Sequence, residues 1–126
     1  MQSVDTNILV RLIAQDDPKQ AETAASFITR RSWVSHLVLA ETIWVLGTAY
    51  QRTHLQLVKA VEILLSHEHI SLQEPEVVRA ALDGFRKHPS VEFSDWLILE
   101  IARKAGHLAL GTFDRGLAKI DGAQKI

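Results

Sequence analysis

Four acidic residues lie inside the most apolar stretches of the chain. The stretches are SVDTNILV around Asp5, SHLVLAETIWVL around Glu41, EFSDWLIL around Asp95 and LALGTFDRGL around Asp114. An unpaired carboxylate buried in such surroundings costs several kcal/mol. No Lys or Arg lies within three residues of the first three acids, and only Asp114 has a neighbouring cation, Arg115. A hard divalent cation, Mg²⁺ or Mn²⁺, is the simplest compensator for four gathered carboxylates, so the sequence predicts a metal-dependent hydrolase.

The length and composition describe a globular protein. The chain has 126 residues, of which 47 % are hydrophobic and only three are proline, so it can bury a sizeable core and is not disordered. We expect residues 1–126 to form a single domain. The absence of cysteine excludes disulfides and thiolate metal sites. The net charge of −1 argues neither for nor against a nucleic-acid substrate.

The sequence predicts no membrane partner. The N-terminus has no basic region ahead of its short apolar run, so it does not resemble a signal peptide. No apolar segment reaches the roughly 20 residues that are needed to cross a bilayer. Because the chain also lacks cysteine, we expect a cytoplasmic protein.

Short apolar strands alternate with helices about five times along the chain. Strands are predicted to end at residue 4, to cover 33–34, 70–72 and 108–110, and to include the last residues. Helices are predicted over 6–13, 18–30, 36–50, 54–65, 75–85 and 94–106, and for one turn after Asp114. The predicted N-caps are Asp17, Ser35, Thr53 and Ser94. The region of Gly84 and His88-Pro89 is expected to end the helix that begins at Pro75.

This alternation predicts an α/β fold with a parallel sheet that helices cover on both faces. Ligands in such folds bind beyond the carboxyl ends of the strands, and Asp5 and Asp114 follow the first and fourth predicted strands there. Asp95 lies in the first turn of a helix, whose dipole favours a carboxylate. Glu41 lies two turns into its helix among apolar neighbours, and its long side chain is expected to reach the same pocket.

The order and spacing of these motifs resemble those of the PIN domain. Asp-Thr-Asn after the first strand, Glu in the third helix, Ser-Asp at the start of a late helix and Thr-Phe-Asp after the fourth strand carry the resemblance, which covers the whole chain. More narrowly, the chain resembles the VapC-type toxins of bacterial and archaeal toxin–antitoxin pairs. The resemblance implies a three-layer α/β/α fold with a central, mostly parallel sheet of four to five strands, in a single nuclease domain over residues 1–126.

The resemblance also implies an activity and partners. It implies a Mg²⁺- or Mn²⁺-dependent endoribonuclease that cleaves RNA phosphodiester bonds with metal-activated water. It further implies a toxin that forms a homodimer and is inhibited by a cognate antitoxin protein.

Matched by position, the family's catalytic acids correspond to Asp5, Glu41, Asp95 and Asp114, here called the acidic quartet. Of these, Asp5, Asp95 and Asp114 are the expected direct metal ligands, and Glu41 is expected to orient the attacking water or to bind a second metal. Asn7 and Thr112 are candidates for holding the carboxylates in position. Four basic residues could contact RNA phosphates or be ordinary surface charge: Arg11, Arg103, Arg115 and Lys119. The chain departs from many relatives at Gly116 and Leu117, where these carry a further acidic residue.

Each acid has a structural interpretation beside the functional one. Asp5 and Asp114 could cap or precede short helices, and Asp95 could be an ordinary first-turn acid. Glu41 has no capping role in the middle of a helix. Because four such acids rarely meet at one sheet edge by accident, the metal site is the favoured interpretation.

Two other functions stay open. One is an Asp-dependent phosphatase or phosphotransferase, although that chemistry generally needs a second Asp at position 7, where this chain has Asn. The other is a catalytically idle PIN-like module that binds protein or RNA. Elsewhere, the three tryptophans, Trp33, Trp44 and Trp96, are expected in the core, and His67-Glu68-His69 is expected to be a solvated loop and strand edge.

Overall fold

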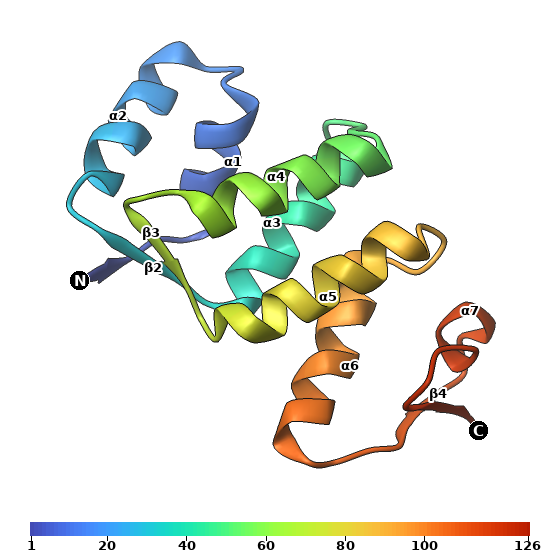
Figure 1. The fold of residues 1–126 in the computed structure, drawn as a ribbon. Coiled ribbons are helices and arrows are strands. Elements are labelled where there is room, and N and C mark those ends of the chain that lie inside the picture. Colours follow the sequence, from blue (N-terminus) through green and yellow to red (C-terminus); the bar gives the residue numbers. More distant parts are fainter. The chain divides into compact units, whose positions relative to one another are not determined.

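Short strands and helices alternate along the chain, as the sequence predicts (Figure 1). The computed structural model describes all residues, Met1–Ile126. The chain divides into two compact units, an N-terminal unit of Met1–Pro75 and a C-terminal unit of Glu76–Ile126. No helix in either unit has both the length and the apolar character that a bilayer crossing requires.

Three parallel strands form the sheet of the N-terminal unit. They are β1 (Gln2–Ser3), β2 (Ser32–Val34) and β3 (Ile70–Leu72), in the spatial order β1-β2-β3. The connecting helices are α1 (Thr6–Ala14), α2 (Pro18–Ile28), α3 (His36–Thr48) and α4 (His54–Ser66). Helix α1 packs against α2 and α3, and α4 packs against α3 and β3. The largest fully buried side chains of this unit include Leu9, Ile28, Leu39, Leu46 and Leu64.

Side-chain caps fix where these helices begin. Asp5, Asp17, Ser35 and Thr53 each accept a hydrogen bond from the backbone N–H three residues later. Each cap satisfies a backbone donor that has no partner inside the helix. The three caps predicted for this unit are therefore confirmed, and the cap at Asp5 sets the position of the first acid of the quartet.

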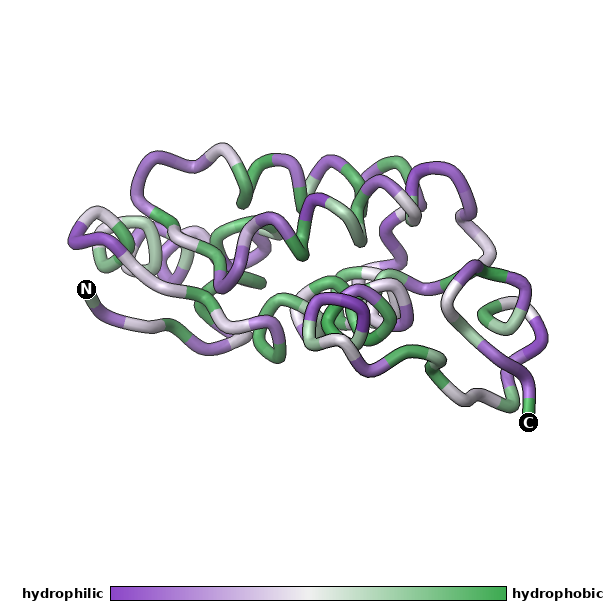
Figure 2. The backbone as a smooth tube through the Cα atoms, turned by 60° about the horizontal axis from the view of Figure 1, so that its bottom comes forward, coloured by the Kyte–Doolittle hydropathy of each residue, from purple (hydrophilic) through white to green (hydrophobic).

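The C-terminal unit contains three helices and a two-stranded parallel sheet. Its elements are α5 (Pro75–Lys87), α6 (Phe93–Ala105), β4 (Leu110–Thr112), α7 (Arg115–Ala118) and β5 (Ala123–Lys125). Phe85 of α5 and Phe93 of α6 meet edge to face, with ring centroids 5.7 Å apart. Figure 2 shows hydrophobic and hydrophilic residues alternating along the helices, as expected for helices with one buried face.

The α/β class and the parallel direction of the strands are confirmed. The five strands pair as one sheet of three and one sheet of two, where the sequence analysis expected one central sheet of four to five. Each pairing observed is parallel, which is the arrangement that strand–helix alternation favours.

Two local predictions in the C-terminal unit were wrong. Helix α6 begins at Phe93, with Glu92 as the N-cap and no side-chain cap bond, because the buried Phe93 is already helical; Ser94 therefore caps nothing. Strand β4 lies two residues later than predicted, because Leu110 is the first residue paired with β5. The predicted end of helix α5 is confirmed at His88-Pro89, since the helix runs to Lys87; Gly84 lies inside the helix, against the Trp96 ring.

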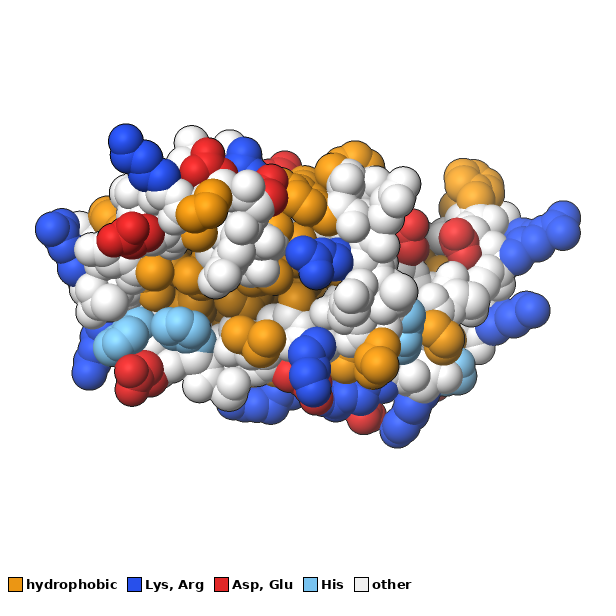
Figure 3. Space-filling model, turned by 90° about the horizontal axis from the view of Figure 1, so that it is seen from above, with side chains coloured by type: hydrophobic (Ala, Val, Ile, Leu, Met, Phe, Trp, Pro, Cys, Tyr) orange, Lys and Arg blue, Asp and Glu red, His pale blue; other side chains and the backbone are white.

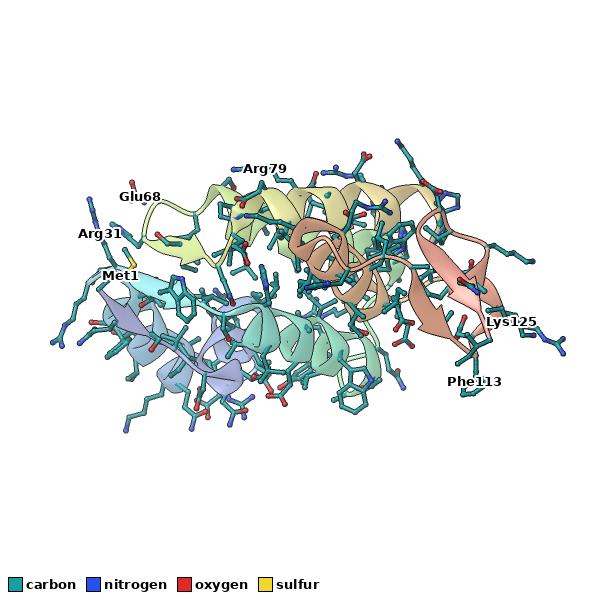
Figure 4. All side chains as sticks on the ribbon, turned by 90° about the horizontal axis from the view of Figure 1, so that it is seen from below. Met1, Arg31, Glu68, Arg79, Phe113 and Lys125 are labelled. Atoms are coloured by element: carbon teal, nitrogen blue, oxygen red, sulfur yellow. The ribbon has the colours of Figure 1, made fainter.

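The tryptophan prediction holds for one residue of three. Trp96 is 5 % exposed and belongs to the core, whereas Trp33 and Trp44 are 38 % and 57 % exposed. In β2 the neighbours of Trp33 point inward, so strand alternation turns Trp33 outward. Figure 3 shows hydrophobic side chains on one face of the molecule, with charged side chains around them. Glu68 points outward from the turn before β3 (Figure 4), as the solvated-loop prediction requires.

Candidate functional site

The first acid stands at the start of α1, beyond the carboxyl end of β1. Asp5 Oδ1 accepts a hydrogen bond from the Ile8 N–H at 3.3 Å, and the partial positive charge of the helix N-terminus favours the carboxylate there. The side chain is exposed, so the expectation of a buried acid was wrong: the apolar neighbours in sequence point into the core while Asp5 faces outward. Oδ2 has no protein partner.

Glu41 contacts the start of α1 through a hydrogen bond with Thr6. The Thr6 hydroxyl donates a hydrogen bond to Glu41 Oε1 at 2.5 Å, and Thr6 directly follows Asp5. The contact joins residues 35 positions apart, because α1 packs against α3. The N-terminal unit therefore brings two of the four predicted acids into one neighbourhood.

Glu41 also stands between exposed apolar side chains on α3. Leu37 and Trp44, one turn to either side of it, are 77 % and 57 % exposed. Their spacing of four and three residues puts all three on one face of the helix. The predicted apolar neighbours are present, but Glu41 is exposed with them, because the buried face of α3 is formed by other residues, such as Leu39 and Leu46.

Asp95 and Asp114 form the second acidic pair, in the C-terminal unit. Asp95 is half-buried in the first turn of α6. Burial raises the pKa of the Asp95 carboxyl, and the negative charges of Asp114 and Glu92 raise it further. No basic side chain lowers this pKa, and no hydrogen bond or ion pair compensates the carboxylate. Asp95 is thus the member of the quartet that matches the predicted cost of an unpaired charge.

The turn after β4 holds Asp114 in place. Asp114 Oδ1 accepts a hydrogen bond from the Leu117 N–H at 2.8 Å and so caps α7. The Asp114 N–H donates to Thr112 Oγ1 at 3.0 Å. Phe113, between them, is exposed and points away from the unit (Figure 4). Like Asp5, Asp114 is exposed and acts as a helix cap, so its predicted burial was also wrong.

The chemistry of these side chains fits a hard divalent metal. All four acids offer carboxylate oxygens, which Mg²⁺ and Mn²⁺ prefer. A cation beside Asp95 and Asp114 would relieve the repulsion that raises the Asp95 pKa. Within either unit, no three acidic or histidine side chains gather around one point. The Asp95–Asp114 pair offers two carboxylates, a number that suits Mg²⁺, which keeps several of its waters.

The two predicted supporting residues have different surroundings. Thr112 supports Asp114 through the hydrogen bond from the Asp114 backbone N–H. Asn7 is exposed in the first turn of α1 and lines the same surface hollow as Asp5. Sequence reasoning missed Thr6, although it lies between Asp5 and Asn7, because no spacing rule links it to Glu41.

Two of the four basic residues have partners within the protein. Arg11 donates hydrogen bonds to the Tyr50 hydroxyl at 2.9 Å, to Gln20 Oε1 at 2.7 Å and to Asp16 Oδ1 at 3.2 Å. The Tyr50 hydroxyl also donates to Asp16 Oδ2 at 2.8 Å. The hydrogen bond with Tyr50 and the charge of Asp16 raise the pKa of Arg11. Arg11 therefore ties α1 to α2 and to the end of α3.

Arg103 has a similar structural role in the C-terminal unit. Its Nε pairs with Glu100 at 3.2 Å, and its Nη2 donates to the Asp121 carbonyl oxygen at 2.8 Å. In contrast, Arg115 and Lys119 are exposed at the two ends of α7, and Arg115 directly follows the helix cap Asp114. These two residues are the better placed of the four for contact with a substrate.

Comparison with known proteins assigns the chain to a family. The PIN domain matches residues 3–123, a range that includes both units and all four acids. PIN domains form a nuclease superfamily whose members generally depend on divalent metals. Comparisons with curated proteins and with solved structures gave no match. The match over nearly the whole chain shows that this protein belongs to the PIN domain family.

Proposed function

We propose that this protein is a Mg²⁺- or Mn²⁺-dependent endoribonuclease with the acidic quartet as its catalytic residues. The observation that carries the proposal is the pair of Asp95 and Asp114: two carboxylates close enough for one to raise the pKa of the other, with no basic partner at Asp95. Membership of the PIN domain family supplies the nuclease class. Uncompensated, clustered charge in a nuclease is best explained by a cation that binds there.

In this proposal Asp5, Asp95 and Asp114 hold the metal. When bound, a divalent ion supplies an activated water and neutralises charge on the scissile phosphate. Glu41 orients the attacking water: the hydrogen bond from Thr6 holds Oε1 and leaves Oε2 for that contact. Thr112 keeps the Asp114 turn in place through the backbone N–H, and Asn7 lines the same hollow as Asp5.

The substrate contacts come from the basic residues that remain available. Arg115 and Lys119 are exposed at the two ends of α7, so they are suited to RNA phosphates. Arg11 and Arg103 are less available for the contacts with RNA phosphates that the sequence predicts, because both guanidinium groups already bind protein acceptors. A ribonuclease of this kind would act on cellular RNA in the cytoplasm.

We further propose that the protein is the toxin of a toxin–antitoxin pair and forms a homodimer. Support for a protein partner comes from Leu37 and Trp44, exposed apolar side chains on either side of Glu41. A partner that covered this face of α3 would shield the carboxylate. An antitoxin Arg that reached the acids would form charge-assisted bonds and compete with the metal.

Cleavage of single-stranded RNA with Mn²⁺ or Mg²⁺ tests the activity. We expect cleavage by the wild type, none in EDTA, and a loss of about 100-fold or more in Asp95→Asn, which keeps the shape of the side chain but removes its charge. The matched control is Asp83→Asn, an exposed acid of α5 that pairs with Lys87 at 3.1 Å. Circular dichroism checks that both variants fold.

The same assay separates the rival functions. Wild-type rates in Asp95→Asn would sink the assignment of the site. Hydrolysis of a phosphate monoester without RNA cleavage would favour the Asp-dependent phosphatase, and RNA binding without cleavage in either metal would favour the idle module. For the toxin role, induced wild type should arrest bacterial growth while Asp95→Asn should not.

A further inference from the structure

Three shallow hollows on the N-terminal unit share walls along α2. One, of about 610 Å³, extends from Asp5 to Lys19 and Thr23. A second, of about 530 Å³, continues from Lys19 and Thr23 to Phe27 and Arg30. A third, of about 500 Å³, reaches from Phe27 back to Asp5. Because neighbouring hollows have residues in common, they form one continuous depression, here called the α2 groove and defined by these five residues.

The groove follows one face of α2. Lys19, Thr23 and Phe27 are four residues apart, so they line up along the helix. Phe27 is half-buried and presents a ring, and the Arg30 guanidinium lies 6.0 Å from the centroid of that ring. This is the distance of a cation–π contact. An aromatic face and a planar cation thus stand together at the end of the groove away from Lys19.

The groove also carries two cations that form no ion pair within the protein. Lys19 and Arg30 are exposed and make no ion pair, whereas nearby Arg11 is bonded to Asp16, Tyr50 and Gln20. Two acids line the same groove, Asp5 and Glu22. Since no carboxylate of the protein pairs with Lys19 or Arg30, their charge is available to an external anion.

This combination fits a single nucleic-acid strand. Proteins bind single strands with cations that track the phosphates and with aromatic rings on which bases stack. Bases in an RNA duplex are already stacked, so a lone ring in a shallow groove gains nothing from them. Asp5 marks one wall of the groove and, under the proposed function, the position of the scissile phosphate.

We propose that the α2 groove carries the single-stranded RNA away from the scissile phosphate at Asp5. Lys19 contacts a backbone phosphate, and the Phe27–Arg30 pair stacks a base. The inference rests on the proposed ribonuclease function and extends it by naming the route of the substrate and the residues that hold it.

The test is a double substitution that removes two charges from the groove and leaves the half-buried Phe27 intact. Lys19→Gln/Arg30→Gln should raise KM for a labelled single-stranded RNA about 10-fold at unchanged kcat. The slope of log(kcat/KM) against log salt should become shallower by about 0.7, since the substitutions remove one phosphate contact, that of Lys19, and each such contact with a single strand contributes about 0.7. Duplex RNA of the same sequence should show no such change in KM.

The matched control is Lys59→Gln/Arg79→Gln, which removes two exposed cations that line none of the three hollows. It should behave as wild type. If the wild type cleaves RNA but both double variants have the same KM and salt slope, the route is wrong while the ribonuclease function stands. If the wild type cleaves no RNA with either metal, the proposed function fails and the route fails with it.

Discussion

One added methyl group at Gly84 would test how the fold positions Asp95. A Cβ atom at Gly84 would lie 2.4 Å from the Cε3 and Cζ3 atoms of Trp96. Non-bonded carbons need about 3.5 Å, so Gly84→Ala requires a relative movement of about 1 Å between α5 and the indole. Trp96 is 5 % exposed and its ring also stacks on His88, with centroids 5.8 Å apart. The indole therefore has little room to move alone, and the displacement should reach the neighbouring Asp95.

Two opposing terms set the expected loss of stability. Ala favours a helix interior over Gly by about 0.8–1 kcal/mol, whereas overpacking a core costs about 1–3 kcal/mol. The clash is with a buried ring and not with the end of a flexible side chain, so we expect the larger overpacking values. Gly84→Ala should then reduce the free energy of unfolding by about 1–2 kcal/mol. A 1 Å shift of Asp95 should also lower RNA cleavage by up to about 100-fold.

Urea unfolding followed by circular dichroism measures the first effect, and the cleavage assay with Mn²⁺ measures the second. Gly47→Ala in α3 is the control, because its Cβ would meet only Leu57 Cδ1 at 3.5 Å, an ordinary contact. That variant should be as stable as wild type or more stable by up to about 1 kcal/mol. If Gly84→Ala matches Gly47→Ala in stability and keeps full cleavage, the packing of Trp96 on Gly84 does not position Asp95.

Three further predictions concern charge. The raised pKa of Asp95 means that the native state holds this proton more tightly than the unfolded chain does, so stability falls as pH rises from about 4 through the native pKa. Asp95→Asn should therefore melt at or above the wild-type temperature at neutral pH without metal. Added Mn²⁺ should raise its melting temperature less than it raises that of the wild type. Equal rises in melting temperature would mean that Asp95 and the other acids of the quartet share no metal. The hydrogen bond from Tyr50 is the main cause of the lowered pKa of Asp16. The ionised Asp16 therefore stabilises the fold above about pH 4, and this stabilisation is lost as pH falls through the native pKa. Tyr50→Phe should move the midpoint of acid unfolding to higher pH, and an unchanged midpoint would contradict the role of this network. Calorimetric titration of a cognate antitoxin should show weaker binding to Asp114→Asn than to the wild type, and Mn²⁺ should compete with the antitoxin. An affinity that changes with neither the substitution nor Mn²⁺ would mean that the antitoxin inhibits without contacting the acids.

The sequence predicts those parts of the fold that local interactions determine. Asp17, Ser35 and Thr53 cap their helices as expected, because a cap depends only on residues within one turn. Gly106 ends α6 with φ of 82°, a conformation that glycine adopts at little cost. The packing role of Gly84 was not predicted, since the reason for that glycine is Trp96 on another helix, and packing between helices leaves no mark in local spacing.

For the site, as for the fold, the sequence predicts what depends on neighbouring residues but not what depends on tertiary packing. The positions of Asp5 and Asp114 after strands, and of Asp95 in a first helical turn, follow from element order and were predicted. Their exposure was not, because an apolar stretch in sequence does not say which way one residue faces. The Thr6–Glu41 hydrogen bond depends on how α1 packs on α3. The joint action of the acidic quartet on one metal stays a prediction.

Capping and metal binding at Asp5 are compatible because they use different oxygens. Oδ1 accepts the Ile8 N–H, and Oδ2 has no partner in the protein. Asn caps a helix about as well as Asp but carries no charge, whereas Ala removes both the cap and the charge. Asp5→Asn should therefore keep the wild-type free energy of unfolding within about 0.5 kcal/mol, and Asp5→Ala should lose about 1 kcal/mol.

Both substitutions should abolish metal-dependent RNA cleavage, since neither side chain can replace a carboxylate ligand. Urea unfolding and the cleavage assay with Mn²⁺, applied to the same preparations, separate the two roles. Cleavage at the wild-type rate in Asp5→Asn would show that capping is the only role of Asp5. Equal stability of the two variants would show that a capping hydrogen bond to the Ile8 N–H, which is 3.3 Å long in the wild type, contributes nothing measurable to the free energy of unfolding.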